Sequence, residues 1–194
     1  DWDDRSIYKA GLAPSAQPVL NGLPGATVYH LDITIADDLL SLSGTLDVRY
    51  TNTEDIPLTE IYFRLFPNIL GGSMQISNLQ VDESTVDARY DLNNSLMVVP
   101  LAENLQPGNS IIVHMDYSVE IPDAVEPNYG VLAYADHVLA LAHAYPMISV
   151  YDENGWNAEI PPQDGDVAFD RLVIKRHDDG GARERGHGQR RGVM

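Results

Sequence analysis

The sequence has no cysteine among its 194 residues, and only 12 lysines and arginines stand against 29 aspartates and glutamates. The lack of cysteine excludes a disulfide framework and any thiolate metal site, although it leaves the compartment open. No run of about 18 apolar residues occurs, so no membrane span is predicted. A chain of this length is predicted to form one domain of ordinary size with an adequate core.

The few basic residues are unevenly spread. Residues 171–194 hold seven of the 12 basic residues and three of the 29 acidic ones, a net charge of +4, which leaves five basic and 26 acidic residues in 1–170, a net charge of −21. A surface this acidic repels phosphate backbones and anionic lipid headgroups. The sequence therefore predicts no nucleic-acid partner.

Alternation of apolar and polar residues recurs along the chain and is typical of half-buried strands. The most regular example is Ser110–Glu120, in which Ile111, Val113 and the odd positions that follow are apolar. Strands are predicted at 29–35, 42–51, 60–66, 75–81, 86–92, 96–101, 110–120, 131–134 and 138–143. Acidic, Asn-Asn and Pro-Gly turns separate them, and no segment has a helical period over ten residues. The sequence thus predicts an all-β fold, an antiparallel twisted double sheet or β-sandwich.

Two flanking segments differ from this pattern. Residues 1–26, rich in Ala, Pro, Gly and Ser, are predicted to be a lead-in loop, and residues 27–170 the β-domain. Residues 171–194 form a basic tail that is either a disordered arm or the product of a reading-frame slip. The frame-slip hypothesis arises because codons for Gly186–Gly192 can be chosen that read Val-Met-Ala-Ser-Gly-Val one base later. The nucleotide sequence of the gene tests it.

The stretch from His143 to Asn157 is the most distinctive part of the chain. It reads H-A-Y-P-M-I-S-V-Y-D-E-N-G-W-N. It resembles the segment that closes the N-terminal domain of bacterial zinc metallopeptidases related to aminopeptidase N, where the run is roughly Q-W-Y-P-R-x-x-V-Y-D-x-x-G-W-N. The stretches Ile61–Asn68 (I-Y-F-R-L-F-P-N) and Leu105–Ser110 (L-Q-P-G-N-S) are also similar to that family. The resemblance covers roughly residues 27–170 and implies the saddle-like N-terminal domain of such enzymes.

The family's catalytic elements are absent from this sequence. Two histidines one helical turn apart bind zinc in the signature His-Glu-x-x-His, and its Glu activates water. None of the six histidines here is followed by Glu, and the Gly-x-Met-Glu-Asn substrate loop does not occur. The resemblance therefore implies a non-catalytic part of a peptidase, with no metal or cofactor of its own and with zinc in the parent enzyme's catalytic domain.

His143 is the single candidate substrate-binding residue. The resemblance places it near a Gln or Glu that, in the aminopeptidases, holds the free amine of the substrate. A carboxylate or amide oxygen suits that task because an ammonium group only donates hydrogen bonds. A neutral imidazole could accept one such bond, whereas a charged one would repel the amine. The alternative is that His143 is structural, and His30, His114 and His137 are predicted to be solvated or sheet-pairing residues.

Two acid-rich stretches and two aromatic residues are also candidate parts of a binding site. The acid-rich stretches Asp152–Gly155 and Asp164–Asp166 could hold Ca²⁺, but Asn-Gly and Asp-Gly are ordinary turn formers. Tyr151 and Trp156 are predicted to fill a sheet edge or an interdomain seam.

We therefore expect a domain that packs on and caps the cleft of a catalytic domain in the same polypeptide, near that enzyme's peptide substrate. Alone it is expected to be inactive. The alternative is a self-standing secreted β-sandwich that binds a protein or carbohydrate. An extracellular or cell-envelope location is expected, and a chain that starts at Asp1 is expected to be a fragment or to have lost a signal segment.

Overall fold

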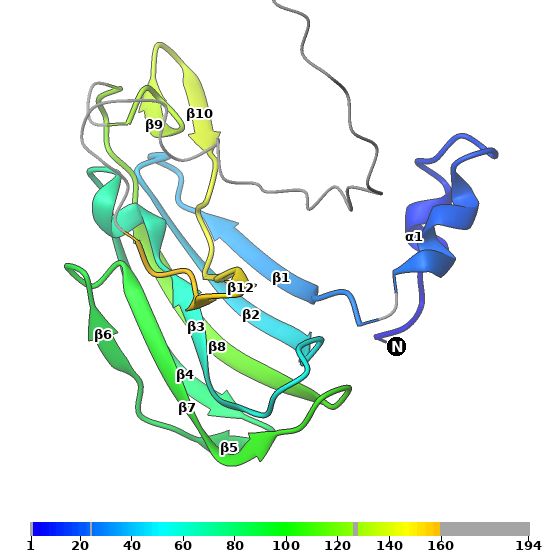
Figure 1. Cartoon of the computed structure of the whole chain (residues 1–194). Helices are drawn as coiled ribbons and strands as arrows, with labels where there is room; N and C mark the ends of the chain where they lie inside the picture. Colours follow the sequence, from blue (N-terminus) through cyan, green and yellow to red (C-terminus); the bar gives the residue numbers. More distant parts are fainter. Residues whose placement is uncertain (1, 24, 126–127, 160–194) are drawn as a thin grey trace, which may run out of the picture. The chain divides into compact units, whose positions relative to one another are not determined.

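The computed structural model describes residues 2–23, 25–125 and 128–159. Within them nearly all regular structure is antiparallel β, as the sequence predicts (Figure 1). The five-stranded sheet has the order β1-β2-β8-β4-β5, and a four-stranded sheet has the order β11-β3-β7-β6. Two hairpins, β9–β10 and β12–β13, complete the described part of the domain.

The strands of the five-stranded sheet are β1 (Val28–Ile35), β2 (Ser41–Thr51), β4 (Ser73–Val81), β5 (Ser84–Thr85) and β8 (Ser110–Glu120). Those of the four-stranded sheet are β3 (Leu58–Arg64), β6 (Arg89–Asp91), β7 (Leu96–Leu105) and β11 (Met147–Ile148). The hairpins comprise β9 (Leu132–Ala135), β10 (Val138–Leu141), β12 (Tyr151–Asp152) and β13 (Gly155–Trp156).

The core lies between the inner faces of the two main sheets. In β8 the alternation predicted from sequence is reproduced, and all five odd-numbered apolar residues are buried. Leu46 and Val48 of β2, and Ile61 and Phe63 of β3, are fully buried in the same cluster. Burying a side chain of this size contributes about 1.5–3 kcal/mol, so this cluster supplies most of the drive for folding.

The pairing of β4 with β8 contains a β-bulge. Ser77 faces Asp116 and Gln80 faces His114, so β4 carries one extra residue between these pairs. Asn78 takes a left-handed φ of 50°, and Leu79 turns into the core. A bulge re-aims side chains in this way, and here it brings the Asn78 side chain to the outer face of the sheet.

Buried asparagines hold several connections in place. The Asn52 side chain donates to the carbonyls of Ile56 and Leu105, both at 2.8 Å, and accepts from the Glu54 amide. Asn128 likewise donates to the carbonyls of Leu70 and Leu132. These side chains replace backbone partners that loops lack, which fixes the loops against the sheets.

Some segments depart from the sequence predictions. The segment predicted as a lead-in loop contains two helical turns, α1 (Ser6–Lys9) and the 3-10 turn η1 (Gln17–Gly22). The strand predicted at 86–92 is shorter in the structure, where β6 covers Arg89–Asp91 and pairs with β7. The strand predicted at 60–66 ends at Arg64, where the 3-10 turn η2 (Phe66–Ile69) follows.

Residues 160–194 lie outside the described residues. The predicted boundary at 170, the Asp164–Asp166 turn and the reading-frame hypothesis for the tail all concern this range, and they stay predictions. No helix among the described residues is long and apolar enough to cross a membrane.

Candidate functional site

The run from His143 to Asn157 lies at the β3 edge of the four-stranded sheet. Met147 pairs with Arg64 and Ile148 with Phe63, which makes β11 the outermost strand there. The Ser149 amide extends the ladder by donating to the Tyr62 carbonyl at 2.8 Å. The run therefore covers one edge of the sheet, as the sequence predicts for its aromatic residues.

Trp156 is the centre of an aromatic cluster that closes this edge. Its ring stacks on Tyr62, with centroids 5.6 Å apart and planes at 12°, and meets the Tyr151 ring edge-on at 5.1 Å. Tyr50 of β2 lies 5.9 Å away on a further side. Such pairs add about 0.5–1.5 kcal/mol each beyond area burial. The cluster joins the β12–β13 hairpin to both main sheets.

A second aromatic group joins the run to the five-stranded sheet. Tyr145 meets Tyr29 of β1 edge-on at 5.8 Å, and the Tyr29 hydroxyl accepts a 3.0 Å hydrogen bond from the Ile148 amide. Burial raises the pKa of Tyr29 to about 12. Burial also raises the pKa of Tyr117, near Tyr145, to about 12. These phenols therefore stay neutral in any ordinary buffer and serve as packing and hydrogen-bonding groups.

His143 is half-buried in a bend before β11. Its backbone has a left-handed φ of 60°, and its Nδ1 lies 3.3 Å from the Met147 sulfur. The ring is 4.8 Å from the Phe66 ring, and the Arg64 guanidinium lies 5.0 Å over the same Phe66 ring. Burial lowers the pKa of His143, so the imidazole is neutral at pH 7. This is the form that could accept a hydrogen bond from an amine.

Arg64, Phe66 and Met147 are parts of this site that sequence reasoning did not single out. Arg64 is buried, and burial lowers its pKa. A guanidinium over an aromatic ring gains cation–π attraction. The stretch I-Y-F-R-L-F-P-N carries Arg64 and Phe66 next to a Pro-Asn turn and was the signal that could have identified these two residues, whereas no comparable signal marks Met147.

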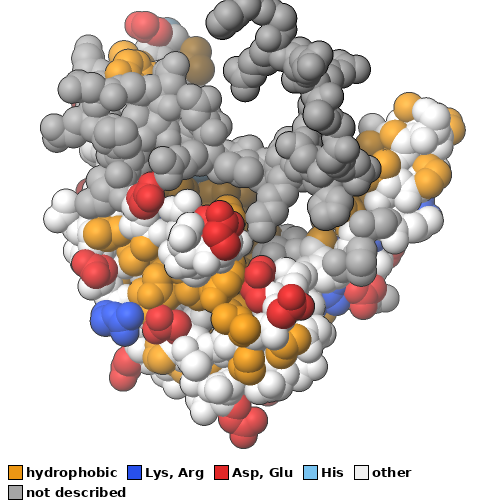
Figure 2. Space-filling view, in the orientation of Figure 1, with side chains coloured by type: hydrophobic (Ala, Val, Ile, Leu, Met, Phe, Trp, Pro, Cys, Tyr) orange, Lys and Arg blue, Asp and Glu red, His pale blue; other side chains and the backbone are white. Residues whose placement is uncertain are grey.

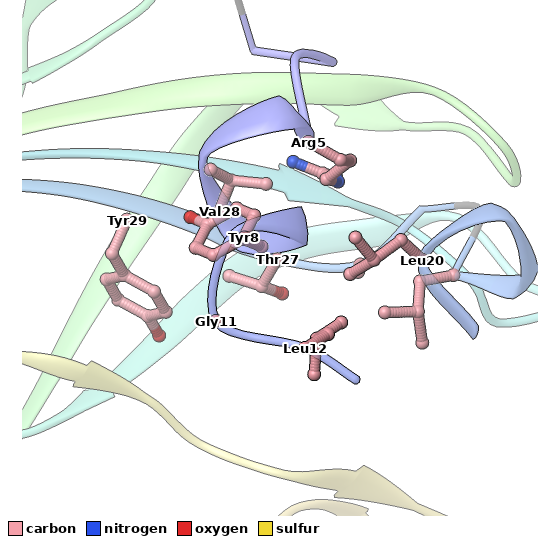
Figure 3. Close-up of a pocket in the computed structure, with 10 residues that line it drawn as sticks. Arg5, Tyr8, Gly11, Leu12, Leu20, Thr27, Val28 and Tyr29 are labelled. Atoms are coloured by element: carbon pink, nitrogen blue, oxygen red, sulfur yellow. The ribbon is translucent and has the colours of Figure 1, made fainter. Parts of the chain in front are cut away.

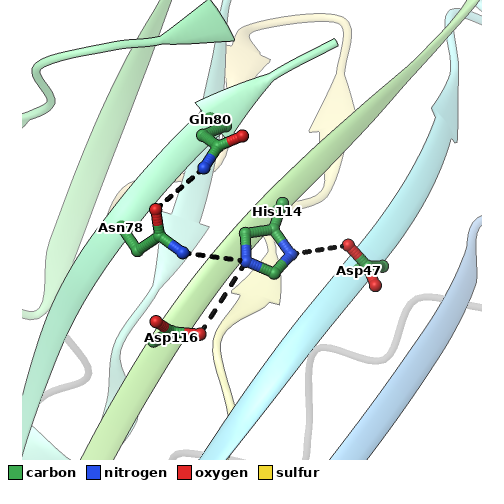
Figure 4. Close-up of polar contacts among 5 residues, drawn as sticks. All are labelled: Asp47, Asn78, Gln80, His114 and Asp116. Carbon is green, nitrogen blue, oxygen red and sulfur yellow. Dashed lines mark hydrogen bonds and ion pairs between the residues drawn. The ribbon is translucent and has the colours of Figure 1, made fainter. Parts of the chain in front are cut away.

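The other described histidines behave as structural residues, as predicted. His114 joins three strands on the outer face of the five-stranded sheet (Figure 4). Its Nδ1 lies 2.8 Å from Asp47 Oδ1 and its Nε2 lies 3.2 Å from Asn78 Nδ2. The ring therefore lies within hydrogen-bonding distance of a side chain from the strand on each side of β8. His30 stacks on Trp2 at 4.0 Å, and His137 is exposed in the β9–β10 turn.

No group of three or more His, Cys, Asp or Glu side chains in the part of the chain that the structure describes could hold a metal ion. The Asp152–Gly155 stretch is the turn of the β12–β13 hairpin, and Asp152 Oδ1 accepts from the Asn154 amide at 2.8 Å. The carboxylate is thus used to form the turn.

An apolar cavity of about 730 Å³ lies between the N-terminal segment and the start of β1 (Figure 3). Tyr8 and Leu12 contribute to its wall from the N-terminal segment, and Val28 and Tyr29 from β1. Among the described residues of its lining, Arg5 is the one charged side chain. The site around His143 does not share this cavity, although Tyr29 borders both.

Comparisons with known proteins give similarity at the level of structure alone. No protein-family model matches the chain, and no curated protein matches it. An M1 zinc metallopeptidase from Deinococcus radiodurans is 21% identical, with a TM-score of 0.40, over 48% of this chain and 19% of that one. A mutant of the enzyme from the same organism gives the same values with 20% of its length covered.

A two-domain M1 zinc metallopeptidase mutant bound to L-tryptophan is likewise 21% identical, with a TM-score of 0.40, over 48% of this chain and 19% of that one. These solved structures are zinc metallopeptidases. The chain matches only about one fifth of the length of each peptidase. A peptidase activity is therefore only proposed for the protein to which it belongs.

Proposed function

We propose that this chain is the non-catalytic N-terminal β-domain of an aminopeptidase-N-like zinc metallopeptidase, and that it packs on a catalytic domain of the same polypeptide and caps its cleft. The observation that carries the proposal is the fold of the run from Tyr145 to Asn157. Its residues resemble the family's closing segment, and within it β11 is the outermost strand of the four-stranded sheet while β12 and β13 form a separate hairpin. Zinc belongs, in this proposal, to the catalytic domain.

The surface at this edge supports a docking role. Val150, between β11 and β12, is 58% exposed even though both flanking residues are partly or wholly covered. Figure 2 shows hydrophobic side chains gathered over β3 and β12, with acidic side chains around them. An apolar patch rimmed by polar residues is typical of an interaction site. The acidic rim fits a partner domain with a basic rim.

His143 is the residue that we propose to lie nearest the substrate. It precedes the edge strand β11, so it would lie at the margin of the docked surface. Its lowered pKa keeps the ring neutral, which permits hydrogen bonding to an amine without charge repulsion. The Met147 sulfur and the Phe66 ring fix its orientation.

The first experiment reads the gene beyond residue 158 in all three frames. A segment encoding His-Glu-x-x-His within about 150 codons supports the proposal, and its absence from every frame contradicts it. The purified 194-residue chain should release no chromophore from aminoacyl anilides with added zinc. Chelator-sensitive turnover by the chain alone would contradict a non-catalytic role.

The second experiment tests the docking surface. The catalytic segment, expressed separately, is titrated with this chain, and Val150→Lys is expected to weaken binding at least tenfold because it places a charge in an apolar contact. Val19→Lys is the matched control, since Val19 is 62% exposed on η1. Equal effects of the two substitutions would show that the Val150 edge is not the interface.

The third experiment uses the whole enzyme and tests His143. His143→Gln restores the family's amide and should keep or lower KM for substrates with a free amine, whereas His143→Leu should raise it. Substrates with a blocked amine should respond equally to both variants. The predicted compartment, extracellular or cell envelope, is tested by fractionation of the source cells.

A further inference from the structure

Strand β1 forms a free edge of the five-stranded sheet. Among the described residues it pairs with β2 alone, in an uninterrupted antiparallel register from Val28 to Ile35. Figure 1 shows its position at the margin of the sheet. Natural edge strands are usually protected by lysine, proline or a bulge. The sequence V-Y-H-L-D-I-T-I contains neither residue, and its pairing with β2 has no bulge.

The inner face of β1 is covered at its start and open over its second half. Tyr29 lies edge-on to Tyr145 there. Beyond it Leu31, Ile33 and Ile35, which share the face of Tyr29, are 38%, 41% and 40% exposed. Their partners in β2 are Leu46, Gly44 and Leu42, which belong to the core-facing side of that strand. The core face of the sheet therefore continues onto β1 without the four-stranded sheet above it.

The outer face of the same half of β1 is acidic. Trp2 covers His30 at the start of the strand, while Asp32 and Thr34 border a polar groove of about 550 Å³. The other described residues of its lining come from β2, β4 and β8, and they include Asp116 but no basic residue. A segment that lay along β1 would thus meet apolar side chains on one face and carboxylates on the other.

We propose that Leu31–Ile35 binds an extended segment of a partner protein as an additional strand, and that this segment alternates apolar residues with lysine or arginine. Main-chain hydrogen bonds to the free edge would supply affinity, and the alternating side chains would supply selectivity, as in other cases of strand addition. The apolar residues would cover Leu31, Ile33 and Ile35, and the basic ones would face Asp32. A second copy of this chain fits poorly, because each copy carries a net charge of −17. The proposal is independent of whether the chain belongs to a peptidase.

The test uses the whole chain and a fluorescein-labelled peptide of sequence TKVKVKVKT. Fluorescence anisotropy at low salt should show saturable binding, and hydrogen exchange should show protection of amides in 31–35. The peptide TEVEVEVET should bind at least tenfold more weakly, and TKVKPKPKT should not bind, because proline cannot donate to the ladder. Equal binding of the basic and proline peptides would mean simple charge attraction and would overturn the proposal.

Substitutions in β1 locate the site. Ile33→Lys places a charge in the apolar strip and should weaken binding of the basic peptide at least tenfold. Asp32→Lys should reduce the preference for the basic over the acidic peptide. Val138→Lys is the matched control on the β9–β10 hairpin, where Val138 is 64% exposed, and should leave binding unchanged. Circular dichroism confirms that each variant is folded. A concentration-dependent dimer lost in Ile33→Lys would identify a second copy as the occupant and overturn the proposal.

Discussion

The Asn52 side chain offers a sharp test of how the loops are held, through the substitution Asn52→Ala. Asn52 is fully buried at the end of β2 and makes three side-chain hydrogen bonds. Its removal leaves the carbonyl of buried Leu105 without that partner, which costs about 1–3 kcal/mol. Ile56 is 51% exposed, so water can replace the bond to its carbonyl at a smaller cost. We expect a total loss of about 3 kcal/mol in the free energy of unfolding.

Urea denaturation followed by circular dichroism measures this loss, and calorimetry should show a Tm lower by roughly 6–12 °C for a chain of this size. Asn104→Ala is the matched control, because Asn104 is an exposed residue near the end of β7, and should cost less than about 0.5 kcal/mol. Asn52→Asp should be more harmful at pH 8 than at pH 5, since a buried carboxylate must be kept neutral. If Asn52→Ala behaves like Asn104→Ala, the reasoning about buried partners is refuted.

Three further predictions concern packing and titration. Gly44→Ala should cost about 1–3 kcal/mol in urea denaturation, because a Cβ there would lie 2.6 Å from the Asp32 carbonyl oxygen and 2.8 Å from the Tyr117 hydroxyl; Ser43→Ala next to it should be neutral. Because the pKa of His143 is lowered in the folded chain, the unfolded chain protonates this imidazole more readily. The stability advantage of wild type over His143→Gln should therefore shrink as the pH falls below about 6.5. An advantage that does not change between pH 8 and pH 5 contradicts this prediction. Burial raises the pKa of Tyr29, Tyr50 and Tyr117 to about 12, so the contribution of these phenols to stability should be constant below pH 10 and fall between pH 10 and 12. Ultraviolet titration should show them ionising late, and complete ionisation by pH 11 in the folded chain would refute this prediction.

The strands with regular alternation were predictable from sequence because side chains in a strand alternate between its two faces. This was enough to predict β2 and β8 and the faces that they bury. It was not enough for β1, which was predicted to bury its apolar face, whereas Leu31, Ile33 and Ile35 are 38%, 41% and 40% exposed. Alternation identifies which side chains share a face, but whether another sheet covers that face depends on the length of the opposing sheet.

The short strands and the contacts of His143 could not be predicted from local sequence patterns. β11, β12 and β13 each have two residues, too few to show any period. The approach of His143 to Met147 depends on a left-handed backbone at a residue that is not glycine, which is uncommon. The role of Trp156 at a sheet edge was predictable in kind, but its partners Tyr50 and Tyr62 come from strands far away in sequence.

The central pair of the five-stranded sheet joins strands that are far apart in the chain. β2 ends at Thr51 and its partner β8 begins 59 residues later, at Ser110. At about 5–20 residues per second, a ribosome takes roughly 3–12 s to synthesise this interval. During that time the edge of β2 that pairs with β8 in the folded chain has no partner strand. A nascent chain stalled before Ser110 should therefore expose the β1–β2 hairpin to chaperones, and release from them should coincide with the emergence of β8.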